Sequence, residues 1–298
     1  IISLNFLYRG GERTNGNIIC SGMSGRGKTT ALKHIIQCLF MAGVKIIVID
    51  PEREFRDLCR NLNGTWLDAG GGTAKINPFQ IRPVPMDDDD EEECDRLYNS
   101  NDNAMALHMH TLETFFKMYI PSLSDLQRAL VKKTLVEMYA KFDITWDTDV
   151  TGMSNEEFPT AKDFYKLLEE KALQDEDYKV LSALLYDMAE GADSFLWNGT
   201  TNIKIDSDFV CFDTNRLVNS SDEVKRAQYY NLLTLCWELT SADRNEPVFL
   251  LCDEGYIMLD PDIPQAAMFV RNYAKRCRKY EGMLGFVVQS VVDILNHR

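Results

Sequence analysis

The stretch that decides the fold is Gly22-Met23-Ser24-Gly25-Arg26-Gly27-Lys28-Thr29. It fits the pattern G-x-x-x-x-G-K-[ST], in which a glycine-rich backbone and a lysine bind phosphates and the hydroxyl binds Mg²⁺. An apolar run precedes it at residues 17–21, and a helical pattern follows it at residues 29–42. This context favours phosphate binding, because a helix N-terminus adds positive potential beside the anion. It disfavours the alternative, a glycine-rich turn that binds nothing.

The motif also predicts which residues contact a nucleotide. Lys28 is expected to reach the β- and γ-phosphates, and Thr29 is expected to bind Mg²⁺. The expected nucleotide-binding set is Gly22, Ser24, Gly25, Arg26, Gly27, Lys28, Thr29 and Thr30.

Strand patterns on both sides of a long helical segment predict a parallel sheet. Residues 44–50 (VKIIVID) form a continuous β-branched run, which is typical of a strand buried on both faces. Further apolar runs occur at 209–212, 247–252 and 285–289, separated by helical stretches at roughly 223–243 and 262–281. Residues 51–84 resemble loops. We expect an α/β fold with a mostly parallel sheet flanked by helices.

Helical periodicity between these strands predicts an all-α insertion. Apolar residues recur at steps of three and four through residues 105–119 and again through 131–142. Thr160 and Asp163 form a capping box, and Leu181, Leu184, Leu185 and Met188 mark a fourth helix that ends at Gly191. The expected organisation is a first part of the sheet domain at residues 1–90, an acidic loop and helical subdomain at 91–196, and a second part at 197–298.

Charge and cysteine usage narrow the class of protein. The formal charge is −14, but the run Asp87–Asp95 holds eight acids, and without it the charge would be −6. An acidic body disfavours a simple nucleic-acid binder, which needs a basic footprint.

The eight scattered cysteines form no C-x-x-C pair, which is typical of a reducing cytosol. No apolar run approaches the ~20 residues of a membrane span, so membrane contact is expected to be peripheral. The chain begins at Ile1, and we expect a piece of a longer protein.

Two acids follow the predicted strand at 247–252. In phosphate-loop enzymes an Asp at this place binds Mg²⁺, and a neighbouring Glu can activate the attacking water. Asp253 is therefore the expected metal ligand and Glu254 the expected catalytic base, which favours ATP hydrolysis coupled to motion. A pair of acids that simply ends a strand is the alternative.

The last strand and the basic segment before it supply two more candidates. Gln289 ends the strand and is expected to sense the γ-phosphate. The segment Arg271–Lys279 holds five basic residues, with Arg271, Lys275 and Arg278 at helical spacing. A solvated basic face is one interpretation; an arginine finger or a contact to nucleic-acid phosphate are the others.

Together these segments resemble a known family. In chain order they are GMSGRGKTT, VIDPEREF, KINPF, FPTAKDF, FLLCDEG, RKYEG and FVVQS. The series is similar to the C-terminal ATPase domain of the conjugative transfer and type IV secretion ATPases TraC and TrbE (the VirB-four type), in the HerA–FtsK group of phosphate-loop motors.

The resemblance implies a RecA-like sheet with a helical lid and a bacterial ATPase that works as a hexamer, although an isolated domain can be monomeric. It implies other type IV secretion components as partners, a location at the cytoplasmic face of the inner membrane, and only an indirect link to DNA. It assigns Lys28 and Glu254 to catalysis with Gln289 as sensor, and Arg278 as arginine finger.

Three functions stay open at this point. The first is an ATP-hydrolysing motor that energises conjugative DNA transfer or channel assembly. The second is a coupling protein that pumps DNA through its own ring. The third is a nucleotide-binding scaffold with little hydrolysis.

Overall fold

The computed structural model of the chain describes residues 15–23, 25–83, 104–259, 263–290 and 292. Ser24 and the acidic run at 87–95 lie outside the described residues. The predicted domain boundaries at 90/91 and 196/197 stay a prediction.

A single six-stranded sheet forms the centre of the described chain. Its strands are β1 (Ile18–Ser21), β2 (Lys45–Asp50), β3 (Thr65–Asp68), β4 (Phe209–Asp213), β5 (Val248–Cys252) and β6 (Gly282–Val288). The order is β1-β6-β5-β2-β4-β3, and all neighbours are parallel. The carboxyl ends of the strands therefore meet at one edge, which confirms the predicted α/β fold.

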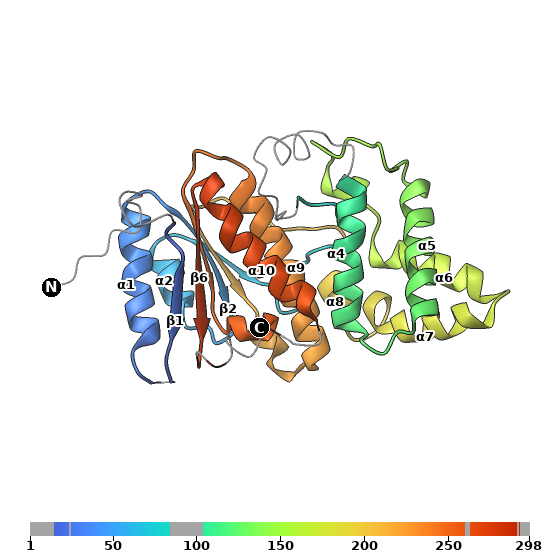
Figure 1. Cartoon of the computed structure of the whole chain (residues 1–298), viewed down its shortest axis with the longest axis horizontal. Helices are drawn as coiled ribbons and strands as arrows, with labels where there is room; N and C mark the ends of the chain where they lie inside the picture. Colours follow the sequence, from blue (N-terminus) through green and yellow to red (C-terminus); the bar gives the residue numbers. More distant parts are fainter. Residues whose placement is uncertain (1–14, 24, 84–103, 260–262, 291, 293–298) are drawn as a thin grey trace.

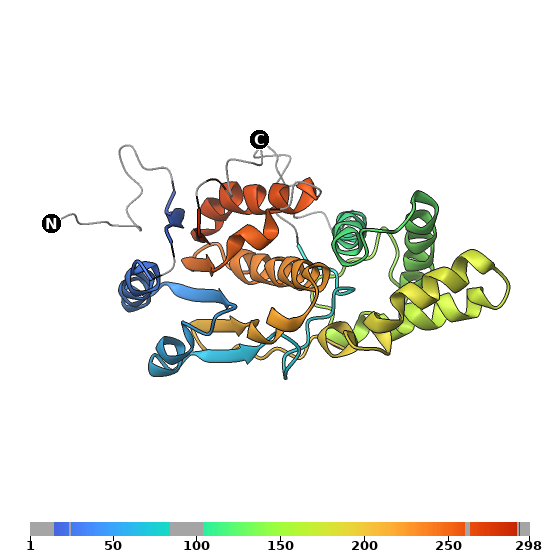
Figure 2. The ribbon, with the colours of Figure 1, turned by 90° about the horizontal axis from the view of Figure 1, so that it is seen from below.

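Alternating side chains of the strands enter two apolar cores. Ile46 and Val48 of β2 face α1 (Lys28–Met41) and α2 (Arg56–Asn61), whereas Ile47 and Ile49 face the core under α9 (Asp222–Ser241) and α10 (Pro264–Arg276). Figure 2 shows these two helix pairs on opposite faces of the sheet. Burial on both faces explains the continuous β-branched run that predicted β2.

The insertion consists of helices that lie beside the sheet domain (Figure 1). They are α4 (Ala104–Tyr119), α5 (Asp125–Lys141), α6 (Ala161–Ala172), α7 (Glu176–Ala189) and α8 (Ser194–Trp197). The capping box of α6 is confirmed: Asp163 accepts hydrogen bonds from the Thr160 backbone N–H (2.9 Å) and hydroxyl (2.7 Å). Leu184, expected on the apolar stripe of α7, is instead 38% exposed.

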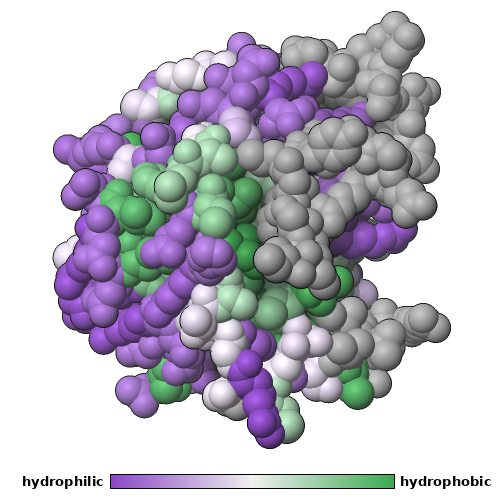
Figure 3. Space-filling model, turned by 90° about the vertical axis from the view of Figure 1, so that its left-hand side faces the viewer, coloured by the Kyte–Doolittle hydropathy of each residue, from purple (hydrophilic) through white to green (hydrophobic). Residues whose placement is uncertain are grey.

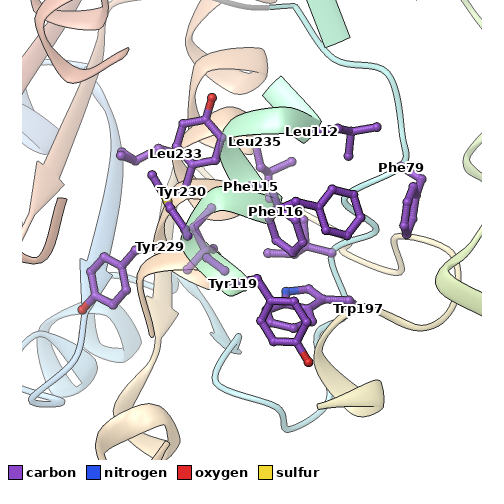
Figure 4. Packing of buried hydrophobic residues seen from close by; sticks show 14 of the residues in the cluster. Phe79, Leu112, Phe115, Phe116, Tyr119, Trp197, Tyr229, Tyr230, Leu233 and Leu235 are labelled. Atoms are coloured by element: carbon purple, nitrogen blue, oxygen red, sulfur yellow. The ribbon is translucent and has the colours of Figure 1, made fainter. Parts of the chain in front are cut away.

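Aromatic packing fuses the insertion to the sheet domain. Phe115 and Tyr119 of α4 stack edge-on against Trp197, with ring centroids 5.2 and 4.8 Å apart. The same core continues into Tyr230 and Leu233 of α9 (Figure 4). Because one core spans both parts, the insertion packs as an extension of one face of the sheet domain.

Buried polar side chains also join the two parts. Arg82 is 4% exposed, forms an ion pair with Glu238 of α9 (3.1 Å) and donates to the Asn77 carbonyl and the Thr201 hydroxyl. Tyr139 of α5 donates to the Phe79 carbonyl (2.6 Å), and His108 of α4 lies 2.9 Å from the Tyr139 oxygen. We call Phe79, Arg82, His108, Tyr139 and Glu238 the insertion joint.

Two elements differ from the sequence expectations. The segment interpreted as loops after residue 50 contains α2 and β3, the latter an edge strand of four residues. The last helix ends at Arg276 and continues as a 3₁₀ turn, η5 (Cys277–Tyr280), so Arg278 leaves the helical spacing of Arg271 and Lys275. Arg276 is buried, which also departs from a fully solvated basic face.

The opposite edge strand, β1, lies at the side of the molecule shown in Figure 3, where apolar surface occurs among hydrophilic side chains. Ile19 of β1 is 65% exposed. Within the described residues, no helix has the length and apolar character needed to cross a membrane.

Candidate functional site

A cavity of about 690 Å³ lies at the carboxyl edge of the sheet. Four strands deliver its residues: the phosphate loop follows β1, the turn with Glu52 and Glu54 follows β2, Asp253 and Glu254 follow β5, and Gln289 follows β6. Its lining is Met23, Gly25, Gly27, Lys28, Thr29, Thr30, Lys33, Glu52, Glu54, Asp253, Glu254, Val287, Val288 and Gln289. This is the place where open parallel sheets bind ligands.

The phosphate loop needs glycine at two described positions. Gly25 and Gly27 have φ angles of 75° and 84°, in the left-handed region that side chains disfavour. Gly27 is the N-cap of α1, so the helix begins at Lys28 and its first N–H groups face the cavity edge. The Lys28 ammonium donates to the Gly22 carbonyl, which keeps the cation over the loop.

Thr29 points to an acid from the next strand. Its hydroxyl donates to Glu54, which lies 25 residues further along the chain. Glu54 is held by Asp50, the fully buried last residue of β2, whose carboxylate accepts the N–H groups of Glu54 (2.9 Å) and Phe55 (2.8 Å).

Glu254 is positioned by its backbone and by two donors. Its φ and ψ angles are 54° and 35°, a left-handed conformation that is uncommon outside glycine and occurs at functional sites. Its carboxylate accepts hydrogen bonds from the Tyr256 hydroxyl (2.6 Å) and the Gln289 amide (3.3 Å). A base fixed in this way at a phosphate-binding cavity can orient a water molecule and accept its proton.

Negative charge accumulates on one side of the cavity. Burial raises the pKa of Asp253 to about 7, with smaller contributions from the carboxylates of Asp50, Glu254 and Glu54 and against a hydrogen bond from the Glu254 N–H. Burial, with a contribution from Asp213, likewise raises the pKa of Asp50 to about 6. Such raised values mark a site that lacks compensating positive charge.

These residues fit a divalent cation held mainly by water and phosphate. Asp253 supplies a hard oxygen ligand in a cluster of like charges, and Thr29 supplies a hydroxyl beside it. Among the described residues no three His, Cys, Asp or Glu side chains form a complete metal cage. Mg²⁺ suits this arrangement, because it usually retains several waters and takes only one or two protein ligands with the substrate phosphates.

The structure brings most of the sequence-predicted residues together. Gly25, Gly27, Lys28, Thr29, Thr30, Asp253, Glu254 and Gln289 line the cavity, and Gly22 contacts Lys28. Arg26 is exposed and does not line it. Arg278 lies in η5 before the start of β6, so it is at the amino edge of the sheet, away from the cavity of its own chain.

Sequence reasoning missed Glu54 and Tyr256. For Glu54 a signal existed: it follows an apolar strand by four residues, as an acid at the same edge as the phosphate loop. Tyr256 gave no signal, because its contact depends on the 3₁₀ turn η4 (Gly255–Met258). Tyr256 also lines a neighbouring cavity of about 470 Å³, which shares Glu52 and Glu254 with the first.

Comparison with known proteins places this geometry among relatives. The family model described as the TraG P-loop domain matches residues 5–298. Protein TraC of Escherichia coli K12 is 21% identical over 294 residues, which cover 97% of this chain and 31% of TraC. An uncharacterized protein of Bacillus anthracis is 20% identical, with 98% and 50% covered. The chain thus spans 31% to 50% of the length of these curated relatives.

Solved structures agree with the sequence comparison. The structure of VirB4 of Thermoanaerobacter pseudethanolicus superposes with a TM-score of 0.89 at 42% identity, covering 98% of this chain and 74% of that one. The bacterial conjugative coupling protein TrwB, solved in complex with the ATP analogue ADPNP, superposes with a TM-score of 0.51 at 13% identity, covering 93% and 65%. The latter likeness concerns the fold alone.

Proposed function

Because the chain belongs to the TraG P-loop domain family and to the VirB4 family, we propose that it is an ATP-hydrolysing motor domain. Its work is to energise conjugative DNA transfer or the assembly of a type IV secretion channel. The observation that carries the proposal is the geometry of Glu254: a fixed carboxylate, bonded to Gln289, in the same cavity as Lys28 and Asp253.

Five residues that line the cavity have a chemical role in this proposal. Lys28 and the loop N–H groups bind the β- and γ-phosphates, and Asp253 with Thr29 holds Mg²⁺, which when bound offsets the charge of the phosphates. Glu254 accepts the proton of the attacking water. Gln289 donates to Glu254 and lines the same cavity, so we expect its hydrogen bond to change when the γ-phosphate leaves.

The relatives support the proposed partners. We propose that the chain acts with other type IV secretion components at the cytoplasmic face of the bacterial inner membrane, and its likeness to VirB4 and TraC supports this proposal. We propose a homo-oligomer, a hexamer when active, in which DNA is served indirectly.

Arg278 fits a role between subunits. It lies at the amino edge of the sheet, so it can act only on the ATP of a neighbouring copy. Mixing Lys28→Ala subunits, which keep Arg278, with Arg278→Ala subunits, which keep Lys28, should restore part of the ATPase activity. If no activity returns at concentrations where the subunits assemble, Arg278 does not act in this way.

Two variants test the motor itself. Lys28→Ala should abolish ATP binding, whereas Glu254→Gln should bind ATP and lose at least about 100-fold in turnover, since it removes a general base. Binding is measured by calorimetry and turnover by phosphate release. Unchanged turnover in Glu254→Gln would refute the base; secretion or transfer supported by Lys28→Ala would point to a scaffold instead.

A further inference from the structure

The turn after β2 presents an acid to the phosphate loop, and its construction is elaborate. The Asp50 carboxylate accepts hydrogen bonds from the backbone N–H groups of Glu54 and Phe55. Arg53, at a φ angle of 59°, forms an ion pair with the buried carboxylate of Asp213 at 2.6 Å. Asn215 donates its side-chain amide to the Pro51 carbonyl (2.8 Å), and its backbone N–H donates to Asp213 (2.8 Å). The turn is therefore fastened to β2 and β4 on both sides of Glu54.

The result of this fastening is a fixed contact between Glu54 and Thr29. A threonine hydroxyl has one proton to donate and two lone pairs with which to accept or ligate. Because the carboxylate takes that proton, the lone pairs of the Thr29 oxygen are left for a cation. A carboxylate that holds the proton of a metal ligand also orients that ligand and increases its basicity.

Electrostatics favours the same interpretation. Glu54 adds negative charge to a cavity that already holds Asp253 and Glu254. An additional carboxylate would only repel the phosphates of a nucleotide unless a cation lay between them. Its placement is thus explained by cation binding and not by phosphate binding.

We propose that Glu54 is a positioning residue for Mg²⁺, acting through the hydroxyl of Thr29. The inference rests on the proposed function, since it assumes that the cavity binds a nucleotide with Mg²⁺. It assigns to the β2 turn a task in cation affinity that is separate from phosphate binding by Lys28.

The chain offers a matched control in Glu52. This residue belongs to the same turn, carries the same charge and lines the same cavity, but the Thr29 hydroxyl donates to Glu54. Glu52→Gln and Glu54→Gln therefore remove equal charge, and only the second removes the carboxylate bonded to Thr29.

The experiment compares the affinity for the fluorescent analogue mant-ATP in excess Mg²⁺ with that in EDTA. The ratio of the two affinities measures the Mg²⁺ enhancement without any need for turnover. We expect Glu54→Gln to lower this enhancement at least about 10-fold, as for other carboxylates bonded to metal ligands. Glu52→Gln should stay within about 2-fold of the wild-type ratio, and Glu54→Gln should still bind mant-ATP in EDTA.

Two further variants show whether Glu54 acts through Thr29. Glu54→Asp keeps the charge but shortens the side chain, and it should lose enhancement as Glu54→Gln does. In a Thr29→Val background, Glu54→Gln should cause no additional loss, because effects through one shared group are not additive.

The outcomes separate this inference from the function on which it rests. A wild-type ratio in Glu54→Gln, an equal loss in Glu52→Gln, or no Mg²⁺ enhancement in a wild-type protein that binds mant-ATP overturns the role of Glu54. Failure of the wild-type protein to bind mant-ATP in either condition refutes the nucleotide site itself.

Discussion

The carboxyl edge of the sheet and the insertion joint both place ionisable side chains out of water, but they compensate them differently. At the joint, Arg82 is paired with Glu238 and surrounded by acceptors, and burial lowers the pKa of His108 to about 3, so this imidazole stays neutral. At the sheet edge, carboxylates gather and the pKa of Asp253 is raised to about 7 by burial and by its acidic neighbours. The buried charge of Arg82 at the joint is therefore paired with an opposite charge, whereas the carboxylates at the sheet edge lie among like charges.

This difference indicates that the insertion joint stabilises the fold, whereas the sheet edge is arranged for binding a ligand. A buried network whose charged groups are paired, as Arg82 is with Glu238, fixes the position of the insertion on the sheet domain. An accumulation of like charges destabilises the fold and is retained where a ligand will neutralise it. Among the described non-glycine residues with a positive φ angle, Arg53 and Glu254 lie at this edge, whereas Asn63, Asp143 and Glu281 lie in turns elsewhere.

Removal of Arg82 should produce the largest loss of stability and so test the joint most severely. Arg82→Met keeps much of the volume but removes the guanidinium that pairs with Glu238 and donates to the Asn77 carbonyl. Because Glu238 is partly exposed, we expect a loss of about 3 kcal/mol, at the lower end for a broken buried pair. Urea unfolding measures it.

The control is an exposed ion pair of the insertion, Lys141 with Glu170 at 3.5 Å. Lys141→Met should cost less than about 1 kcal/mol. Equal losses in the two variants would mean that the joint is no more than a surface contact.

His108 should give the joint a defined pH dependence. Its folded pKa of about 3 lies below the unfolded value near 6.5, so only the unfolded chain takes up a proton between these values and stability falls as pH falls. From pH 7 to pH 5 the wild type should lose about 2 kcal/mol relative to His108→Gln. Urea unfolding at each pH measures the difference.

His110, which is exposed two residues further along α4, provides the matched comparison. His110→Gln should keep the wild-type pH dependence. The same pH dependence in His108→Gln as in the wild type would show that His108 is not buried in its neutral form.

Asp253, at the sheet edge, should change the stability with pH in the opposite direction to His108. Its folded pKa of about 7 lies above the unfolded value near 3.9, so the folded chain holds the proton longer and stability falls as pH rises between them. Between pH 6 and pH 8 the wild type should lose about 1 kcal/mol relative to Asp253→Asn. The exposed acid Asp177, replaced by Asn, should give no such change; a difference of zero or of opposite sign at Asp253 would contradict the uncompensated edge.

The same contrast explains what the sequence could predict. The apolar run of β2, the phosphate loop and the capping box of α6 are local patterns, and the structure confirms them. The strand β3 was missed because four residues at a sheet edge carry too little periodicity. Arg82, His108 and Tyr139 come from separate segments, and no spacing in the sequence predicts that they lie close together.

Within the site, the sequence could predict the residues that belong to the phosphate loop or directly follow a strand. Lys28, Asp253, Glu254 and Gln289 line one cavity, because parallel strands bring their carboxyl ends together. Their neighbours depend on turn conformations. Glu54 reaches Thr29 only through the Asp50 turn, and Tyr256 reaches Glu254 only through a left-handed residue and a 3₁₀ turn.

Tyr256 offers the mildest test of the sheet edge, since it donates to one oxygen of the Glu254 carboxylate and Gln289 donates to the other. Its hydroxyl donates to the Glu254 carboxylate at 2.6 Å, but its side chain is 36% exposed, so water can replace part of the bond. Tyr256→Phe should therefore lower kcat of ATP hydrolysis only about 2- to 5-fold, or roughly 0.5–1 kcal/mol, with KM unchanged. Tyr186→Phe, at an exposed tyrosine of α7, should leave kcat unaltered. A rise in kcat would reverse the interpretation, because Tyr256 would then restrain the base instead of aligning it.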